Sequence, residues 1–167
     1  MKPILETERL VFTPFTAEDL DLLASLHSDP EVQRYIGGMW DRETIQKRLD
    51  QYVSDQATRG VSKWKAHLRD GTFVGRAGIS WWEPESAYEL GYSFARAAWG
   101  LGLASEAAQG IVDWFFATTP HRTLIGFADV GNLASRRVLE KVGMTWLGDK
   151  DMGFGGLSSL YRMDRPT

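Results

Sequence analysis

The sequence predicts an α/β (α+β) fold with a mixed sheet and helices on both faces. Runs of adjacent strands and strand–helix alternation both occur along the chain, and that combination favours a mixed sheet. The 167 residues match the size of one ordinary domain. No linker, repeat or low-complexity segment interrupts them, so we expect residues 1–167 to form a single domain. The apolar fraction of 43% and the charged fraction of 25% are typical of globular proteins.

The first third of the chain predicts one strand and two helices. Residues 9–14 have the composition of a strand, which the proline at its end stops. Thr16 is expected to cap a helix over residues 17–28, whose apolar side chains recur at helical spacing. Asp41 is expected to cap a second helix that ends near Gly60.

The middle of the chain predicts three strands, over residues 64–68, 73–82 and 88–94. An Asp-Gly pair between the first two is a hairpin signal. Side chains alternate between the two faces of a strand. The third strand therefore places Glu89 on the face opposite Tyr88, Leu90 and Tyr92.

The last third predicts two helices and three strands. The order is helix, strand, helix, strand, strand, over residues 101–118, 123–129, 133–142, 144–147 and 158–163. Gly143 is placed to end the second helix.

Composition excludes several classes of protein. The chain has no cysteine, which removes disulfides, thiolate metal sites and a covalent acyl-cysteine intermediate. The three histidines are scattered without metal-ligand spacing, so we expect no metal. The net charge of −3 argues against a nucleic-acid partner. No apolar stretch approaches the length of a membrane span, and no signal peptide opens the chain, so a cytoplasmic protein is expected.

The segment Trp99-Gly-Leu-Gly-Leu-Ala-Ser-Glu106 follows a predicted strand and opens a helix. A helix N-terminus offers unpaired amides and a partial positive charge, which suit an anion. Gly100 and Gly102 let a phosphate approach the backbone, and Ser105 could add a hydroxyl donor. The alternative is a glycine-rich turn without a ligand. The segment lacks the Gly-Lys-Ser/Thr of a P-loop and the third glycine of a dinucleotide fingerprint.

Several segments, taken in order, resemble the GNAT superfamily of acyltransferases. Residues 88–94 with 99–107 resemble its acetyl-CoA motif, and residues 132–135 with 139–144 resemble its second motif. The opening Glu6-Thr-Glu-Arg-Leu10 is similar to the branch of ribosomal-protein N-terminal acetyltransferases, the RimJ/RimL type. One position departs from the wider superfamily, because Ala97 stands where a Gln or Arg is frequent.

The resemblance implies a GNAT fold, with a central mixed, mostly antiparallel sheet of about seven strands and helices on both faces. It also implies that acetyl-CoA binds in a splay between two parallel strands, with its pyrophosphate on the amides of the glycine-rich turn. The cofactor-binding residues it implies are Phe94, Gly100, Leu101, Gly102, Leu103, Ala104, Ser105 and Asn132. Asn132 can equally be the N-cap of the helix that follows it.

Direct transfer to an amine needs a base, because an alkyl amine is mostly charged at neutral pH. Our candidate is Glu89, with a structural carboxylate as the alternative. The leaving thiolate benefits from a proton donor. The superfamily's frequent tyrosine donor is replaced by Leu139, and the resemblance implies Ser135 in that role. A serine in the first turn of a helix can also simply satisfy a backbone amide.

The predicted function is therefore acetyl transfer from acetyl-CoA to a primary amine, either a peptide N-terminus or a small amine-bearing molecule. The alternatives are a non-catalytic acyl-CoA-binding or sensing domain, and a nucleotide-binding regulatory domain. A monomer and a homodimer both remain open, since the Phe154-Gly-Gly-Leu157 segment fits a dimer contact or a loop.

Overall fold

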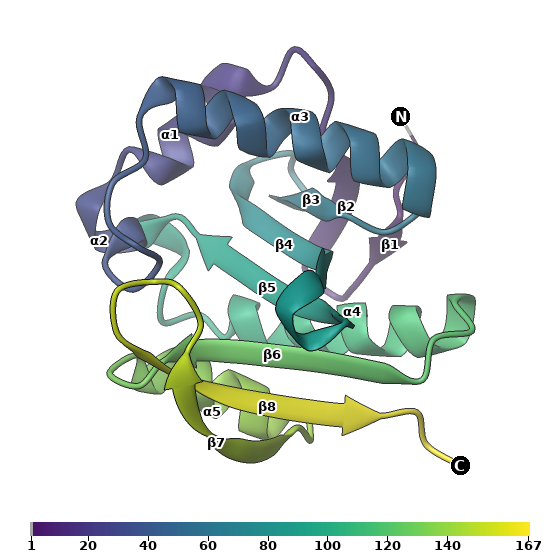
Figure 1. Ribbon diagram of the computed structural model, residues 1–167. Helices are drawn as coiled ribbons and strands as arrows, with labels where there is room; N and C mark the ends of the chain where they lie inside the picture. The colour runs from purple at the N-terminus through teal and green to yellow at the C-terminus, as the bar shows by residue number, and fades with distance from the viewer. Residues whose placement is uncertain (1) are drawn as a thin grey trace.

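The computed structural model describes residues 2–167, and its centre is an eight-stranded sheet in the order β1-β2-β3-β4-β5-β6-β8-β7 (Figure 1). The strands are β1 (Leu5–Glu6), β2 (Leu10–Pro14), β3 (Lys63–Leu68), β4 (Phe73–Trp82), β5 (Ala87–Phe94), β6 (Thr123–Asp129), β7 (Thr145–Asp151) and β8 (Leu157–Asp164). Every neighbouring pair is antiparallel except β5–β6, which is parallel. The predicted mixed, mostly antiparallel sheet is confirmed, with one more strand than expected.

The helices cover both faces of the sheet (Figure 1). They are α1 (Leu20–His27), α2 (Pro30–Gln33), α3 (Arg42–Arg59), α4 (Leu103–Thr118) and α5 (Leu133–Lys141). One core joins α4 and α5 to the apolar side of β2–β6, and a smaller core joins α1 to α3. No helix within residues 2–167 is long and apolar enough to cross a membrane.

Helix ends follow the capping chemistry of the sequence in all but one case. Asp41 accepts a hydrogen bond from the Thr44 amide, and Gly60 ends α3 with φ +73°. Thr16 does not cap α1, so that prediction is wrong. The Asp19 carboxylate instead accepts the Thr16 amide and pairs with Lys65 of β3, which holds residues 16–19 in a turn and delays the helix to Leu20.

Other differences have simple physical causes. Helix α4 begins at Leu103, two residues later than predicted, because Gly100 and Gly102 adopt φ near +77° and +78°. The sequence did not reveal β1 and α2, which are only 2 and 4 residues long. Strand β7 extends to Asp151 although its side chains are largely exposed, since pairing with β8 stabilises it without an alternating apolar pattern.

The parallel pair β5–β6 separates along its length (Figure 1). Pairing covers only Tyr88–Leu90 against Leu124–Gly126, and it ends there. Along one edge of an antiparallel strand, only every second residue directs its backbone N–H and C=O groups to the neighbouring strand. Because the Ala95 amide donates to Val74 of β4, Tyr92 and Phe94 direct their backbone groups away from β4 and toward the gap. The gap is the splay that the sequence resemblance implied.

Candidate functional site

The glycine-rich turn after β5 presents a row of unpaired amides. The first helical bond of α4 runs from the Glu106 amide to the Gly102 carbonyl. Within residues 2–167, the amides of residues 100–105 donate to no carbonyl and no side chain. A Cβ at Gly100 would meet no atom within 4 Å, so the turn is open on that side. These groups can hold an anion such as a pyrophosphate.

The turn is fastened to the N-terminal strands by Arg9 and Glu106. The Arg9 guanidinium donates to the Leu101 carbonyl at 2.8 Å and to the Glu106 carboxylate at 2.7 Å. Glu106 also accepts from the Thr7 hydroxyl and the Arg9 amide. This network fixes the first turn of α4 and so orients its free amides.

One backbone group of Phe94 is already engaged within the protein. Its carbonyl oxygen already accepts the indole N–H of Trp99 at 2.8 Å. The Phe94 amide and both backbone groups of Tyr92 therefore remain the main donors and acceptors of the splay. We call the splay and the turn at residues 100–105 together the amide region.

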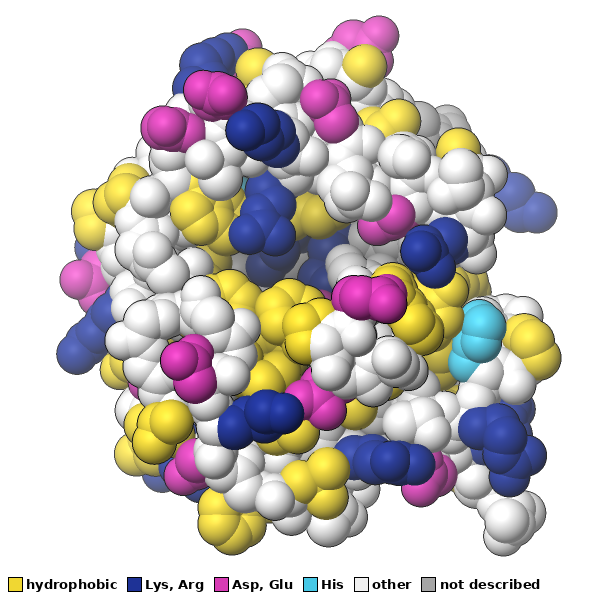
Figure 2. All heavy atoms as spheres, viewed as in Figure 1, with side chains coloured by type: hydrophobic (Ala, Val, Ile, Leu, Met, Phe, Trp, Pro, Cys, Tyr) yellow, Lys and Arg dark blue, Asp and Glu magenta, His cyan; other side chains and the backbone are white. Residues whose placement is uncertain are grey.

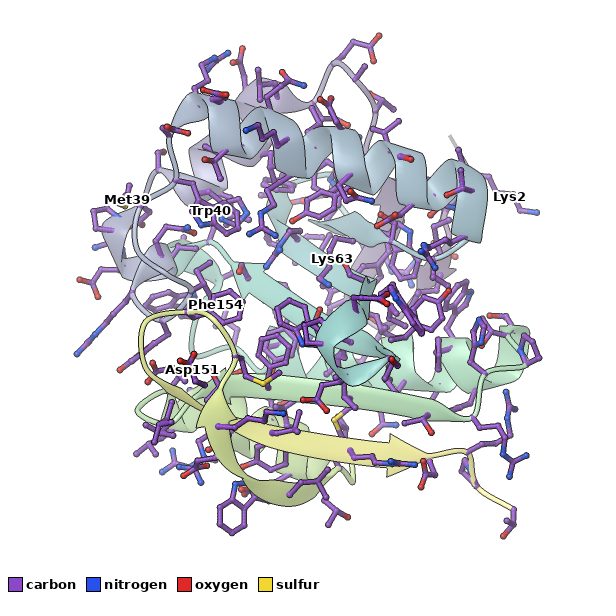
Figure 3. All side chains as sticks on the ribbon, in the orientation of Figure 1. Lys2, Met39, Trp40, Lys63, Asp151 and Phe154 are labelled. Carbon is purple, nitrogen blue, oxygen red and sulfur yellow. The ribbon has the colours of Figure 1, made fainter. Side chains whose placement is uncertain are left out.

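A cavity of about 400 Å³ lies beside the splay, between α3, the sheet and the β7–β8 loop. Figure 2 shows this face hollowed, with Lys and Arg side chains in its upper part and apolar side chains below. Figure 3 labels Trp40 before α3, Lys63 on β3 and Phe154 in the β7–β8 loop, all of which line the cavity. Phe154 packs on Trp82 and Phe127 and so serves as a wall of this cavity.

Glu89 lines the cavity and is paired with Lys63. The Lys63 ammonium lies 3.1 Å from the Glu89 carboxylate and donates to the Ser80 hydroxyl at 2.8 Å. A Cβ at Gly91 would lie 2.6 Å from Glu89 Oε1 and 2.8 Å from Lys63 Cε, so the ion pair lies directly over this glycine. Burial lowers the pKa of Lys63, and the Glu89 charge opposes that shift. The predicted face of Glu89 is confirmed, and the carboxylate reaches over Gly91, where the splay begins.

Arg76 of β4 lies on the same face of the sheet and also lines the cavity. It is 8% exposed. Its guanidinium donates to the Tyr52 hydroxyl at 2.8 Å and to the Ser93 hydroxyl at 2.9 Å. The cavity is therefore lined by the buried Lys63–Glu89 ion pair and by a second buried cation, Arg76 of β4, which lies opposite Ser93 of β5. We call it the charged cavity.

Ser135 and Asn132 lie where α5 begins, on the β6 side of the cavity. Asn132 Oδ1 accepts the Ser135 amide at 3.3 Å, which confirms the capping role. The Asn132 Nδ2 donates to no group within the described residues. The Ser135 hydroxyl bonds the Tyr92 hydroxyl at 3.0 Å. Burial raises the pKa of Tyr92, so its phenol keeps a proton to donate at neutral pH.

The structure brings some predicted site residues together and leaves others apart. Glu89, Asn132 and Ser135 line one cavity, whereas residues 100–105 lie outside it in the glycine-rich turn after β5. The sequence interpretation missed Lys63 and Arg76. Arg76 lies inside the predicted strand 73–82, and Lys63 lies directly before the predicted strand 64–68. Charged side chains are rarely buried, so their presence in these strands was the signal that could have identified them. Tyr92 gave no signal, since it fits an apolar alternation.

No cluster of metal-ligating side chains occurs among residues 2–167. Of the carboxylates that line the charged cavity, Glu89 pairs with Lys63, Asp55 accepts from the Gln51 side chain, and Asp129 accepts from the Gly131 amide.

Comparison with known proteins identifies similar chains. Residues 9–145 match the family model described as "Acetyltransferase (GNAT) domain". The protein YkkB of Bacillus subtilis is 37% identical over 133 residues, which cover 76% of this chain and 77% of YkkB. The N-acetyltransferase p20 of Bacillus licheniformis is 28% identical over 164 residues, covering 94% and 92% of the two chains.

Solved structures share the fold. An acetyltransferase from Agrobacterium tumefaciens superposes with a TM-score of 0.83 at 24% identity, covering 98% of this chain and 94% of the other. RimL, a ribosomal L7/L12 alpha-N-protein acetyltransferase in complex with coenzyme A, gives 0.82 at 15% identity and covers 98% of both chains. At these identities the matches establish the fold alone.

Proposed function

Because the chain belongs to the GNAT family of N-acetyltransferases, we propose that it transfers an acetyl group from acetyl-CoA to a primary amine by direct attack. The observation that carries this proposal is the amide region opening beside the charged cavity. A donor thioester in the splay and an amine in the cavity would meet at Gly91. The absence of cysteine leaves no thiol for an acyl-enzyme intermediate.

The residues present fit acetyl-CoA. The free amides of residues 100–105 suit its pyrophosphate, and the open side of Gly100 leaves room for it. The Tyr92 and Phe94 backbone groups and the Asn132 Nδ2 suit the amides of the pantetheine arm. When bound there, the thioester supplies an electrophilic carbonyl, and backbone amides of β5 stabilise charge on its oxygen.

Glu89 is the candidate base. Its carboxylate lies over Gly91 and lines the cavity, so it can take a proton from an amine there, directly or through water. Lys63 holds the carboxylate in place at 3.1 Å. The same ion pair also fits the structural alternative, since a buried carboxylate is stable when it is paired.

Ser135 is the candidate proton donor to the leaving thiolate. The Tyr92 phenol lies 3.0 Å from the Ser135 hydroxyl, so a proton lost by Ser135 can be replaced from Tyr92. The hydroxyl does not serve a backbone amide in the described residues, which favours the catalytic interpretation over the structural one.

The finer assignments are part of the proposal; the acceptor class follows from the resemblance to the RimJ/RimL branch, and the others follow from composition and sequence pattern. They are a peptide N-terminus or small amine as acceptor, a cytoplasmic location, one domain over residues 1–167, no metal, and neither a nucleic-acid nor a membrane partner. The net charge of −3 supports the absence of a nucleic-acid partner. Monomer and homodimer remain alternatives.

Thiol release tests the proposed transfer. The protein would be mixed with acetyl-CoA and a panel of primary amines, and free coenzyme A would be measured with a thiol reagent. We expect at least one amine to accelerate thiol release over hydrolysis. Bound acetyl-CoA without release for any amine would favour the sensing domain instead.

A further inference from the structure

Arg76 carries a buried charge that no carboxylate neutralises. Within residues 2–167, no Asp or Glu oxygen lies within 4.0 Å of its guanidinium. The neighbouring lysines on the same face are both paired, Lys63 with Glu89 and Lys65 with Asp19. Arg76 differs from them, because its two hydrogen-bond partners are the neutral hydroxyls of Tyr52 and Ser93.

Such an arrangement is costly unless it has a use. Moving a charged side chain from water into the protein interior costs several kcal/mol of solvation free energy. Arginine has five N–H donors, and the two hydroxyls accept two of them. Nε has no partner in the described residues. The positive charge acts on its surroundings, since it contributes to lowering the pKa of both His27 and Lys63.

A second unpaired cation lines the same cavity. Arg48 of α3 is exposed, stacks over the Trp40 ring at 4.7 Å, and has no carboxylate within 4.0 Å among residues 2–167. Within the described residues, the one carboxylate near Arg59 is that of Asp55, at 3.9 Å, and its guanidinium also donates to the Tyr88 hydroxyl at 3.4 Å. The upper part of the hollow is thus cationic (Figure 2), although the whole chain has a net charge of −3.

The positions of Arg76 and Glu89 suit the two ends of one small molecule. Glu89 Oε1 lies above Gly91, and Arg76 bonds the Ser93 hydroxyl, two residues further along β5. Two residues of a strand span about 7 Å. A molecule with an amine and an anionic group only a few bonds apart can bridge that distance with a hydrogen bond at each end.

We propose that the acceptor is a carboxylate-bearing amine of amino-acid type, whose carboxylate binds Arg76 while its amine points to Glu89. The proposal rests on the proposed acetyl transfer and narrows its acceptor class. Tyr52 and Ser93 hold the guanidinium in position for the carboxylate. The aromatic wall of Trp82, Phe127 and Phe154 then faces the body of the acceptor.

The test compares pairs of acceptors in which a carboxylate is replaced by an uncharged amide. The common free amino acids and their α-amides would be assayed for thiol release, together with short peptides that place a carboxylate on the first side chain. For the best acceptor we expect kcat/KM to favour the acid over its amide by at least about tenfold, the ratio that 1.4 kcal/mol gives. Selective use of acidic peptides would identify a polypeptide as the source of the carboxylate. Amides used as well as acids would overturn the proposal and leave acetyl transfer intact.

Two variants locate the effect. Arg76→Gln should abolish the preference for the acid, Arg76→Lys should keep part of it, and neither should change the acetyl-CoA dissociation constant. Arg42→Gln, at an exposed ion pair of α3 with Asp21, is the matched control. A preference retained in Arg76→Gln would contradict the proposal, and thermal melts would confirm that each variant is folded.

Binding without turnover separates this proposal from the proposed transfer. Calorimetric titration of 3-phenylpropanoate and 3-phenylpropanamide into the coenzyme A-loaded protein needs no reaction. We expect only the carboxylate to bind, and Arg76→Gln to lose that binding. Carboxylate binding without any amine turnover would support Arg76 while refuting acetyl transfer. Equal binding, or no binding of either compound, would count against the carboxylate site.

Discussion

The amide region consists of backbone groups, whereas the charged cavity consists of side chains contributed by separate strands. Residues 100–105 are contiguous and present their amides because of two glycines and a helix start. Lys63, Arg76 and Glu89 come from β3, β4 and β5 and meet only because of the sheet register. The proposed acetyl donor, acetyl-CoA, would thus be held by backbone groups, which depend little on the side chains present. The proposed amine acceptor would be held by side chains, which can vary between related proteins.

Glu89→Gln should give the largest loss and tests the cavity half of this comparison. Turnover at neutral pH should fall about 10²–10³-fold, within the range that general bases contribute. The loss should shrink toward about pH 10, where the amine loses its proton unaided. Thiol release measured across that pH range checks this, with Glu85→Gln in the η1 turn (Glu83–Glu85) as control. A pH–rate profile like that of the wild type would exclude Glu89 as the base.

Ser135→Ala should have a smaller effect. A thiolate leaves more easily than an alkoxide, since the pKa of a thiol is only about 8.5, so we expect turnover to fall about 20- to 50-fold. Tyr92→Phe should give a comparable loss, because it removes the phenol that bonds Ser135. Acetyl-CoA affinity should stay unchanged in both. Full activity in Ser135→Ala would remove its catalytic role.

Gly100→Val tests the amide half. Both Gly100 and Gly71 have positive φ and open space at the Cβ position, so valine costs each about 1–2 kcal/mol of strain. Only Gly100 precedes the free amides, so we expect the acetyl-CoA dissociation constant to rise about tenfold there, a change of 1.4 kcal/mol. Gly71→Val, in the β3–β4 turn, should lose stability alone. Equal affinities in calorimetric titrations of the two variants would refute the pyrophosphate role.

The smallest expected effect is on the free energy of unfolding and comes from His27 at the end of α1. Burial lowers the pKa of His27 to about 3, and Nδ1 bonds Gln33 at 2.6 Å. The unfolded chain therefore binds a proton that the folded one excludes, so stability falls as pH drops below about 6.5, by at most about 1.4 kcal/mol per pH unit. Urea unfolding at pH 6 and pH 5 should show about 1 kcal/mol of loss. The loss should shrink in His27→Gln and leave a remainder from His67, whose pKa burial also lowers; an unaltered slope would show that other groups cause it.

The same division explains what could be predicted from the sequence. Caps and glycines act within a few residues, so the Asp41 cap, the helix end at Gly60, the capping alternative for Asn132 and the position of the turn after β5 are confirmed. The Asp19–Lys65 pair, which moved the start of α1, joins residues distant in the chain. No local pattern contains such a contact.

The candidate site divides in the same way. Glu89 was placed on the correct face by alternation alone, but its partner Lys63 depends on which strands become neighbours. The Tyr92 hydroxyl meets Ser135 only after α5 docks against the splay. Side-chain pairing across strands therefore needed the structure.

Calorimetric titration of acetyl-CoA, coenzyme A, ATP and NAD into the purified wild-type protein tests the central claim most directly. We predict that the two coenzyme A species bind, because the amide region suits a pyrophosphate joined to a pantetheine arm, and that ATP and NAD do not. Tighter binding of ATP or NAD, or no binding of acetyl-CoA, would contradict the account and leave residues 100–105 as a structural turn.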